Sequence, residues 1–143
     1  MAKPYYAPGS LSAAYYDLIT EADVRLRGDE DIYAGLVPGG GAVLELGAGT
    51  GRLTAGLAAR GLSVVGVDIS PVMLAQAQAR VSALPDDVRG RIELARGDMT
   101  ALSLGRAFDL VMLPFFTLAH VPAGAAWKST FGVAAKHMAQ GAL

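Results

Sequence analysis

Short apolar runs alternate with helical patterns along most of this chain of 143 residues. Runs with the length and β-branched content of buried strands occupy residues 42–46, 63–68, 91–96 and 108–113. Apolar residues that return every three or four positions predict helices over residues 50–60, 71–83 and from residue 123 onward. In the last of these helices, one apolar stripe is formed by Trp127, Phe131, Ala134 and Met138. The alternation predicts an α/β fold in which helices connect the strands of a parallel sheet.

The 41 residues before the first strand differ from the rest of the chain. Helices are predicted over residues 12–20 and 29–37, the second with Asp29 as its N-cap, and Pro38 followed by three glycines ends that helix. We therefore expect two parts. These are a helical N-terminal segment, residues 1–41, and an α/β domain that binds the ligand, residues 42–143.

The first predicted strand leads into a loop with glycine at every second position, namely Gly47, Gly49 and Gly51. Glycine between a strand and a helix allows a ligand to approach the backbone and the free N–H groups of the helix. Dinucleotide-binding loops have the spacing G-x-G-x-x-G, but here Arg52 stands at the position of the third glycine. Glu45 precedes the loop and would repel a pyrophosphate. The pattern favours a ligand that carries a cationic group.

Composition excludes several other classes of function. The net charge of −1 provides no basic surface for nucleic acid, and no apolar run approaches the roughly 18 residues of a membrane span. The chain has no cysteine, which excludes disulfides and thiolate metal sites, and we expect no metal cofactor. The N-terminus lacks the apolar core of a signal peptide, so we expect a cytoplasmic location.

The motifs together resemble the class I S-adenosylmethionine-dependent methyltransferases. VLELGAGTGR resembles their first motif, VVGVDISPVMLAQAQAR their second strand with its acidic end and following helix, ELARGDMTAL their third strand, and FDLVMLPFFTLAHV their fourth. The resemblance covers roughly residue 15 to the end. It implies a Rossmann-like sheet with strand order 3-2-1-4. The segment AYYDLI resembles a helix that many small-molecule methyltransferases fold over the cofactor as a lid.

The resemblance implies S-adenosylmethionine as the cofactor and assigns roles to particular residues. At the methionine end, the resemblance places Glu45 at the amino group, Pro114 beside the sulfonium, and Tyr15 or its neighbour Tyr16 at the carboxylate. Gly47, Ala48 and Gly49 would pass under the methionine and ribose, and Asp68 would bind the ribose hydroxyls. Ile69, Met73 and Met99 would surround the adenine, and Asp98 would accept from its exocyclic amine. Other interpretations stay open: Met73 and Met99 as core residues, and Asp98 as a turn residue.

Four other residues have weaker assignments. His120, in the loop after the fourth strand, is a candidate catalytic base, and His137 is expected at the surface. Asp109 is expected to anchor a neighbouring backbone amide, and Arg52 to be solvated.

The end of the chain bears on both substrate and assembly. Leu113-Pro114-Phe115-Phe116 stands where enzymes that methylate amino groups of nucleic acids carry Asp or Asn before Pro-Pro-aromatic, so a small-molecule substrate is favoured. Relatives continue with a fifth strand, so we expect a truncated sheet whose fourth strand has a bare edge and could pair in a homodimer. A cofactor-binding module without turnover, and an NAD-dependent enzyme, remain alternatives.

Overall fold

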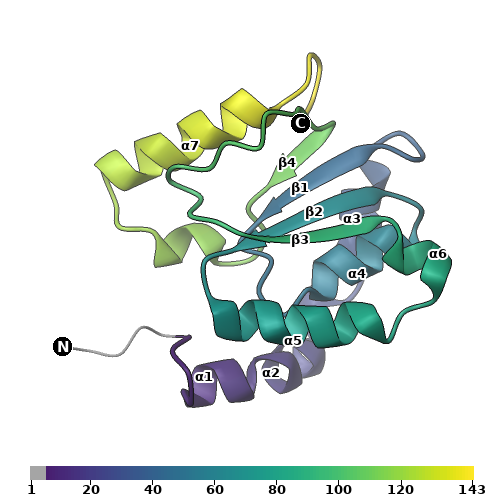
Figure 1. Cartoon of the computed structure of the whole chain (residues 1–143), viewed down its shortest axis with the longest axis vertical. Coiled ribbons are helices and arrows are strands. Elements are labelled where there is room, and N and C mark those ends of the chain that lie inside the picture. The colour runs from purple at the N-terminus through teal and green to yellow at the C-terminus, as the bar shows by residue number, and fades with distance from the viewer. Residues whose placement is uncertain (1–5) are drawn as a thin grey trace.

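The computed structural model describes residues 6–143 and contains the four predicted strands, with helices between the first three and none between β3 and β4 (Figure 1). The elements in chain order are α1 (Leu11–Ala14), α2 (Tyr16–Ala22), the 3-10 helix η1 (Val24–Leu26), α3 (Asp29–Gly35), β1 (Ala42–Leu46), α4 (Arg52–Ala59), β2 (Ser63–Asp68), α5 (Pro71–Ser82), α6 (Asp86–Arg89), β3 (Ile92–Arg96), β4 (Leu110–Met112), the 3-10 helix η2 (Thr117–His120) and α7 (Ala125–His137). Residues 1–5 of the N-terminal segment lie outside the described residues.

The four strands form one parallel sheet in the order β3-β2-β1-β4, which confirms the expected Rossmann-like topology. In the register of the central strand, Val43 pairs with Val64 of β2 and with Leu110 of β4. Because all strands run in one direction, their carboxyl ends meet at the same edge of the sheet. The loops that follow the strands are thereby brought together at that edge.

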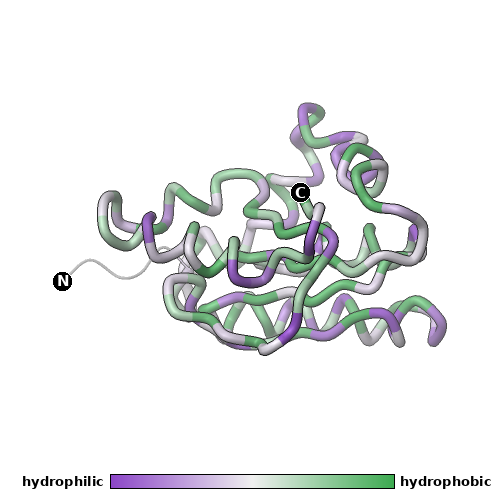
Figure 2. The backbone as a smooth tube through the Cα atoms, turned by 90° about the horizontal axis from the view of Figure 1, so that it is seen from above, coloured by the Kyte–Doolittle hydropathy of each residue, from purple (hydrophilic) through white to green (hydrophobic). Residues whose placement is uncertain are grey.

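Both faces of the sheet are covered, which explains why the strands are almost continuously apolar. Helices α4 and α5 lie on one side and α7 lies on the other (Figure 1). Val43 packs with Leu57 of α4, whereas its neighbour Leu44 belongs to the opposite cluster with Val133 of α7. Hydrophobic and hydrophilic stretches alternate along the helices, as expected for elements with one buried side (Figure 2).

The helix starts follow the expected chemistry at α5 and depart from it at α3. At α5 the Ser70 hydroxyl accepts a hydrogen bond from the Met73 amide at 3.3 Å, and Pro71 occupies the first turn. At α3 the N-cap is Gly28, with φ 83°, and not Asp29 as predicted. The Asp29 carboxylate instead binds the Arg52 guanidinium of α4, a long-range contact that the local sequence does not reveal.

The face of α7 that packs against the sheet is not the predicted apolar stripe. Trp127, Phe131 and Met138 are 37%, 52% and 38% exposed, whereas Thr130, Val133 and His137 are buried.

The expectation of a surface position for His137 is therefore wrong, since this side chain is 1% exposed. Its Nε2 accepts a hydrogen bond from the Leu104 amide at 2.9 Å, so Nδ1 carries the proton and donates to the Val133 carbonyl at 2.7 Å. The histidine is buried because the segment between β3 and β4 needs an acceptor for a backbone amide under α7.

The outer edge of β4 is not bare, so the expectation of an unpaired edge on the fourth strand is wrong. The Val111 amide donates to the Leu143 carbonyl at 2.9 Å, and the Leu143 amide donates to the Asp109 carbonyl at 3.2 Å. The Ala139 amide donates to the Phe108 carbonyl at 2.9 Å. Residues 138–143 therefore supply backbone partners along this edge, which removes the physical reason given for a dimer through β4.

The Asp109 side chain does what the sequence predicted. Its Oδ2 accepts the amide hydrogen of Ala42 at 2.8 Å and so joins the beginnings of β1 and β4.

Gly66 allows α4 to approach β2 closely, and this contact can be tested. A Cβ at residue 66 would lie 2.8 Å from Thr54 Oγ1 and 3.0 Å from Ala48 Cβ, whereas a Cβ at Gly132 of α7 would meet nothing within 4 Å. We expect Gly66→Ala to lower the free energy of unfolding by roughly 1–3 kcal/mol through overpacking. Gly132→Ala should raise it by up to about 1 kcal/mol because alanine favours the helix. Urea unfolding followed by circular dichroism compares the two, and equal effects would contradict the close-packing argument.

Candidate functional site

The loop between β1 and α4 owes its glycines to backbone conformation. Gly47, Gly49 and Gly51 have φ values of 82°, 57° and 75°, in the region that other residues rarely adopt. Gly47 is also needed for space, because a Cβ there would lie 2.5 Å from Thr117 Cγ2, in the loop after β4. The loops that follow the two neighbouring strands therefore touch at this glycine.

Asp68 fixes this glycine loop to the end of β2. Its two carboxylate oxygens accept the amide hydrogens of Gly49 and Ser70, each at 2.8 Å. The amides of Gly47 and Ala48 both donate to the Val67 carbonyl, at 2.8 and 2.9 Å. The loop is thus held in place by backbone bonds, while each Asp68 oxygen retains a lone pair for a further donor such as a hydroxyl.

Glu45 is a buried carboxyl group, 2% exposed, at the carboxyl end of β1. The Thr54 hydroxyl of α4 donates to its Oε2 at 2.5 Å. Burial raises the pKa of Glu45 to about 8, against the smaller lowering effects of the Thr54 hydrogen bond and the Arg52 charge. Arg52 compensates little because its guanidinium is bound to Asp29 at 3.0 and 2.6 Å. A cation beside this carboxyl group would favour its ionised form and lower its pKa.

Glu45 faces a small cavity of about 30 Å³, space for one or two water molecules. Tyr16 and Thr20 of α2 line it from the N-terminal segment, and Pro114 and Thr117 line it from the loop after β4. The cavity can take an ammonium-sized group, whereas a nucleoside is far too large for it. A larger ligand would have to extend from the cavity over the strand ends.

The structure brings Tyr16, and not Tyr15, to the glycine loop. Tyr15 is 52% exposed, whereas the Tyr16 ring would come within 3.9 Å of a Cβ on Gly49, and burial raises its pKa. The sequence held no clear signal for this choice, because α1 ends at Ala14, α2 begins at Tyr16, and Thr20, the buried residue of α2, is polar.

The remaining predicted contact residues follow β2 and β3 and have different environments. Ile69 is 57% exposed at the end of β2, open to a ligand, whereas Met73 is 1% exposed and its Cε supports Gly49, 3.5 Å from the position of a Cβ there. Met99 packs against the cluster on the α7 side of the sheet. Asp98 Oδ1 accepts the amide and the hydroxyl of Thr100 at 2.8 and 2.7 Å, which lowers the pKa of Asp98, so this residue shapes a turn.

The loop after β4 contains an aromatic residue in an unusual conformation. Phe115 has φ 59°, the one positive value at a non-glycine residue within 6–143, and its ring lies 4.8 Å from that of Phe116 between centroids. The two side chains are 47% and 65% exposed. Strained residues of this kind cluster at ligand-binding sites, and Phe115 lines the Glu45 cavity.

An aromatic cluster links this loop to the N-terminal segment. The ring of Tyr6 lies 5.3 Å from that of His120 and 5.8 Å from that of Tyr16, between centroids. Tyr6 was not identified from the sequence, because only the fold brings these three residues together. His120, the candidate base, is exposed at the rim of the site.

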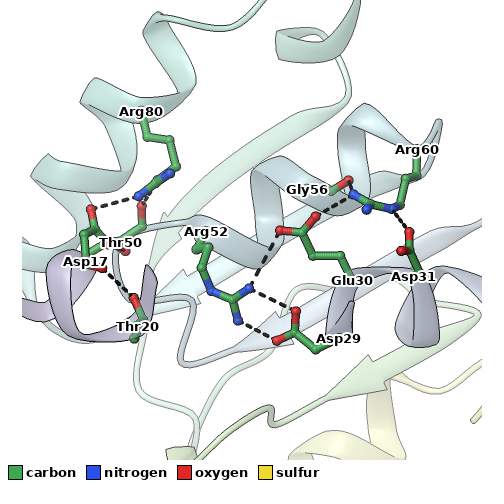
Figure 3. A network of polar contacts seen from close by, with 10 residues as sticks. All are labelled: Asp17, Thr20, Asp29, Glu30, Asp31, Thr50, Arg52, Gly56, Arg60 and Arg80. Carbon is green, nitrogen blue, oxygen red and sulfur yellow. Dashed lines mark hydrogen bonds and ion pairs between the residues drawn. The ribbon is translucent and has the colours of Figure 1, made fainter. Parts of the chain in front are cut away.

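Arginine residues attach the N-terminal helices to the domain (Figure 3). Arg52 binds Asp29 and lies 3.7 Å from Glu30, so its side chain is paired and only 19% exposed, in contrast to the expected solvated position. Arg60 bridges Glu30 at 2.5 Å and Asp31 at 2.7 Å. These pairs hold α3 against α4.

Neither a metal-binding group nor a membrane-spanning helix is found within residues 6–143. No three histidine or acidic side chains there are grouped in a way that could hold a metal ion. None of the helices in this range has the length and apolar character required to cross a membrane.

Comparisons with known proteins agree with this geometry. A model of the family described as "Methyltransferase domain" matches residues 43–141. The magnesium-protoporphyrin O-methyltransferase of Rhodobacter capsulatus is 44% identical over 70 residues, which cover 49% of this chain and 30% of that protein. The glycopeptide N-methyltransferase MtfA, solved with S-adenosyl-L-methionine, has a TM-score of 0.75 at 30% identity, over 80% of this chain and 50% of MtfA. DesVI of Streptomyces venezuelae has a TM-score of 0.76 at 25% identity, over 91% of this chain and 54% of DesVI.

The raised pKa of Glu45 makes a prediction about stability. The folded protein holds a proton on Glu45 up to its raised pKa of about 8, whereas the unfolded chain releases it near the ordinary pKa of 4.5. Between these values the native state binds more protons, so this group lowers the free energy of unfolding as pH rises, by up to about 1.4 kcal/mol per pH unit. Glu45→Gln should therefore gain stability relative to the natural chain between pH 5 and pH 8. Urea unfolding at both pH values measures the difference; a constant difference would refute the assignment.

Proposed function

Because the chain belongs to the methyltransferase domain family, we propose that it binds S-adenosylmethionine at the carboxyl ends of β1, β2 and β3 and transfers its methyl group to a small-molecule acceptor. The observation that carries this proposal is the buried Glu45 carboxyl group beside a glycine loop that Asp68 holds in place. Together they offer an open backbone surface next to a cavity whose carboxyl group would ionise when a cation pairs with it.

The residues present fit this cofactor and do not fit a dinucleotide. The ammonium group of the methionine part matches the size of the Glu45 cavity and would lower the pKa of that carboxyl group by pairing with it. A pyrophosphate at the same loop would meet Glu45 and Asp68, and the nearest guanidinium, Arg52, is already bound to Asp29.

The proposed contacts follow the strand ends. Gly47, Ala48 and Gly49 leave room for the methionine and ribose, and the free lone pairs of Asp68 accept from the ribose hydroxyls. The exposed Ile69 would cover one face of the adenine, with Met99 and the second carboxylate oxygen of Asp98 at its edge. Met73 contributes by supporting Gly49 from below, and Tyr16 takes the place proposed for Tyr15.

The bound cofactor supplies an already activated methyl group, so the chain mainly has to align the acceptor and exclude water. Tyr6 and Tyr16 cover the site from the N-terminal side, and Pro114 and Phe115 cover it from the β4 side. His120 could accept a proton where the acceptor has to lose one. The named relatives act on a magnesium-protoporphyrin and on a glycopeptide, which supports an acceptor of small-molecule type but leaves the acceptor atom open.

The same site allows a second function, cofactor binding without turnover. The chain spans about half the length of the solved relatives and 30% of the curated one, whose activities belong to their full lengths. Turnover of S-adenosylmethionine labelled in the methyl group, tested against a panel of metabolites, separates the two functions.

Calorimetric titration with S-adenosylmethionine and with NAD tests the cofactor. We expect saturable binding of the first, since Glu45 and Asp68 match its ammonium and ribose groups, and no binding of the second. S-Adenosylhomocysteine, which lacks the sulfonium charge, is the matched control and should still bind because it keeps the ammonium group. Binding of NAD without binding of S-adenosylmethionine would overturn the proposal.

Replacement of Asp68 tests the ribose contact. Asp68→Ala should weaken cofactor binding at least about tenfold, because each charge-assisted hydrogen bond contributes roughly 1.5–3 kcal/mol. It should also lower the free energy of unfolding by roughly 1–3 kcal/mol, since the amides of Gly49 and Ser70 lose their acceptor. Asp98→Ala, which removes an exposed carboxylate at the end of β3, should weaken binding less. Unchanged affinity in Asp68→Ala would remove the ribose role.

A further inference from the structure

A closed triangle of hydrogen bonds joins the N-terminal segment to the glycine loop. The Thr50 hydroxyl donates to Asp17 Oδ1 at 2.5 Å, and Arg80 Nη2 donates to Asp17 Oδ2 at 2.8 Å. Arg80 Nε closes the triangle by donating to the Thr50 carbonyl at 3.1 Å. The three residues come from α2, from the glycine loop and from α5, which are separate elements (Figure 3).

The burial of Thr50 distinguishes the triangle from the exposed ion pair of α6. Thr50 is 1% exposed and stands between Gly49 and Gly51. By contrast, Arg89 and Asp86 pair at 2.5 Å within one short helix, with side chains 45% and 92% exposed. Exposed pairs of that kind contribute little, whereas a pair that also bonds a buried hydroxyl and a backbone carbonyl restricts two elements at once.

The residue before Asp17 is the one that covers the loop. Tyr16 lies against Gly49 and lines the Glu45 cavity, and Asp17 follows it directly in α2. The Thr20 hydroxyl shares its one hydrogen between the carbonyls of Tyr16 and Asp17, at 3.0 and 3.1 Å, and so links these two residues within α2. A displacement of Asp17 from Thr50 would therefore move Tyr16 away from the glycine loop.

We propose that Asp17 is a positioning residue for the cofactor site: through Thr50 and Arg80 it holds α2 on the glycine loop and thereby keeps Tyr16 over Gly49. The inference rests on the proposed function for its effect on the cofactor. Its effect on the loop does not depend on any ligand.

The first experiment measures hydrogen exchange in the empty protein. Asp17→Asn keeps the shape of the side chain but removes the charge that binds Arg80, and Arg80→Gln removes the other partner. In both variants the amide hydrogens of residues 47–53 should exchange several-fold faster than in the natural chain. Arg89→Gln, which breaks the exposed pair in α6, is the matched control and should leave these amides unchanged. Arg80→Lys, which retains the charge, should restore part of the protection.

The second experiment measures the dissociation constant of S-adenosylmethionine by calorimetry. Asp17→Asn should raise it about five- to twentyfold, and the same substitution in a Tyr16→Ala background should add almost nothing, because the effect passes through Tyr16. A residue with a merely structural role would weaken binding equally in both backgrounds.

The outcomes separate the two proposals. If the natural chain binds no S-adenosylmethionine, the proposed function fails and the exchange experiment alone decides on Asp17. Unchanged exchange over residues 47–53 in both Asp17→Asn and Arg80→Gln overturns the positioning role. Faster exchange with additive losses in the Tyr16→Ala background overturns the route through Tyr16.

Discussion

The site depends on the two hydrogen bonds that the Asp68 carboxylate accepts from backbone amides. One carboxylate holds Gly49 with one oxygen and Ser70 with the other, so the loop after β1 and the start of α5 share a single anchor. The glycine loop can adopt its positive φ values without a ligand because these bonds, together with those to the Val67 carbonyl, fix it. Preorganisation of this kind means that a ligand does not have to supply the ordering free energy of the loop.

The cation in the wall of the Glu45 cavity, Arg52, is paired with acidic residues of α3. Arg52 lies near Glu45 but is bound to Asp29, and Arg60 and Arg80 are paired with Glu30, Asp31 and Asp17. The arginines of α4 and α5 therefore attach the N-terminal helices and leave Glu45 protonated and uncompensated. The attachment of α2 and α3 and the receptive state of the cavity are two results of the same pairing.

Those parts of the fold that depend on local pattern could be predicted from the sequence. The strands, the start of α5 at Ser70-Pro71 and the glycine loop each have a signal within a few residues, and the strand order followed from the resemblance. The errors concern contacts made across the fold. His137 is polar and looked external, but it provides an acceptor for Leu104, 33 residues earlier. Thr54 as the partner of Glu45, and residues 138–143 along β4, likewise depend on where α4 and the chain end lie in space.

The buried imidazole of His137 has a consequence for the far end of the site. The ring ties the segment between β3 and β4 to α7, because Nε2 accepts the Leu104 amide while Nδ1 donates to the Val133 carbonyl. That segment includes Asp98 and Met99, the residues proposed at the adenine edge. A side chain outside the proposed site thus steadies the adenine side from the opposite face of the sheet.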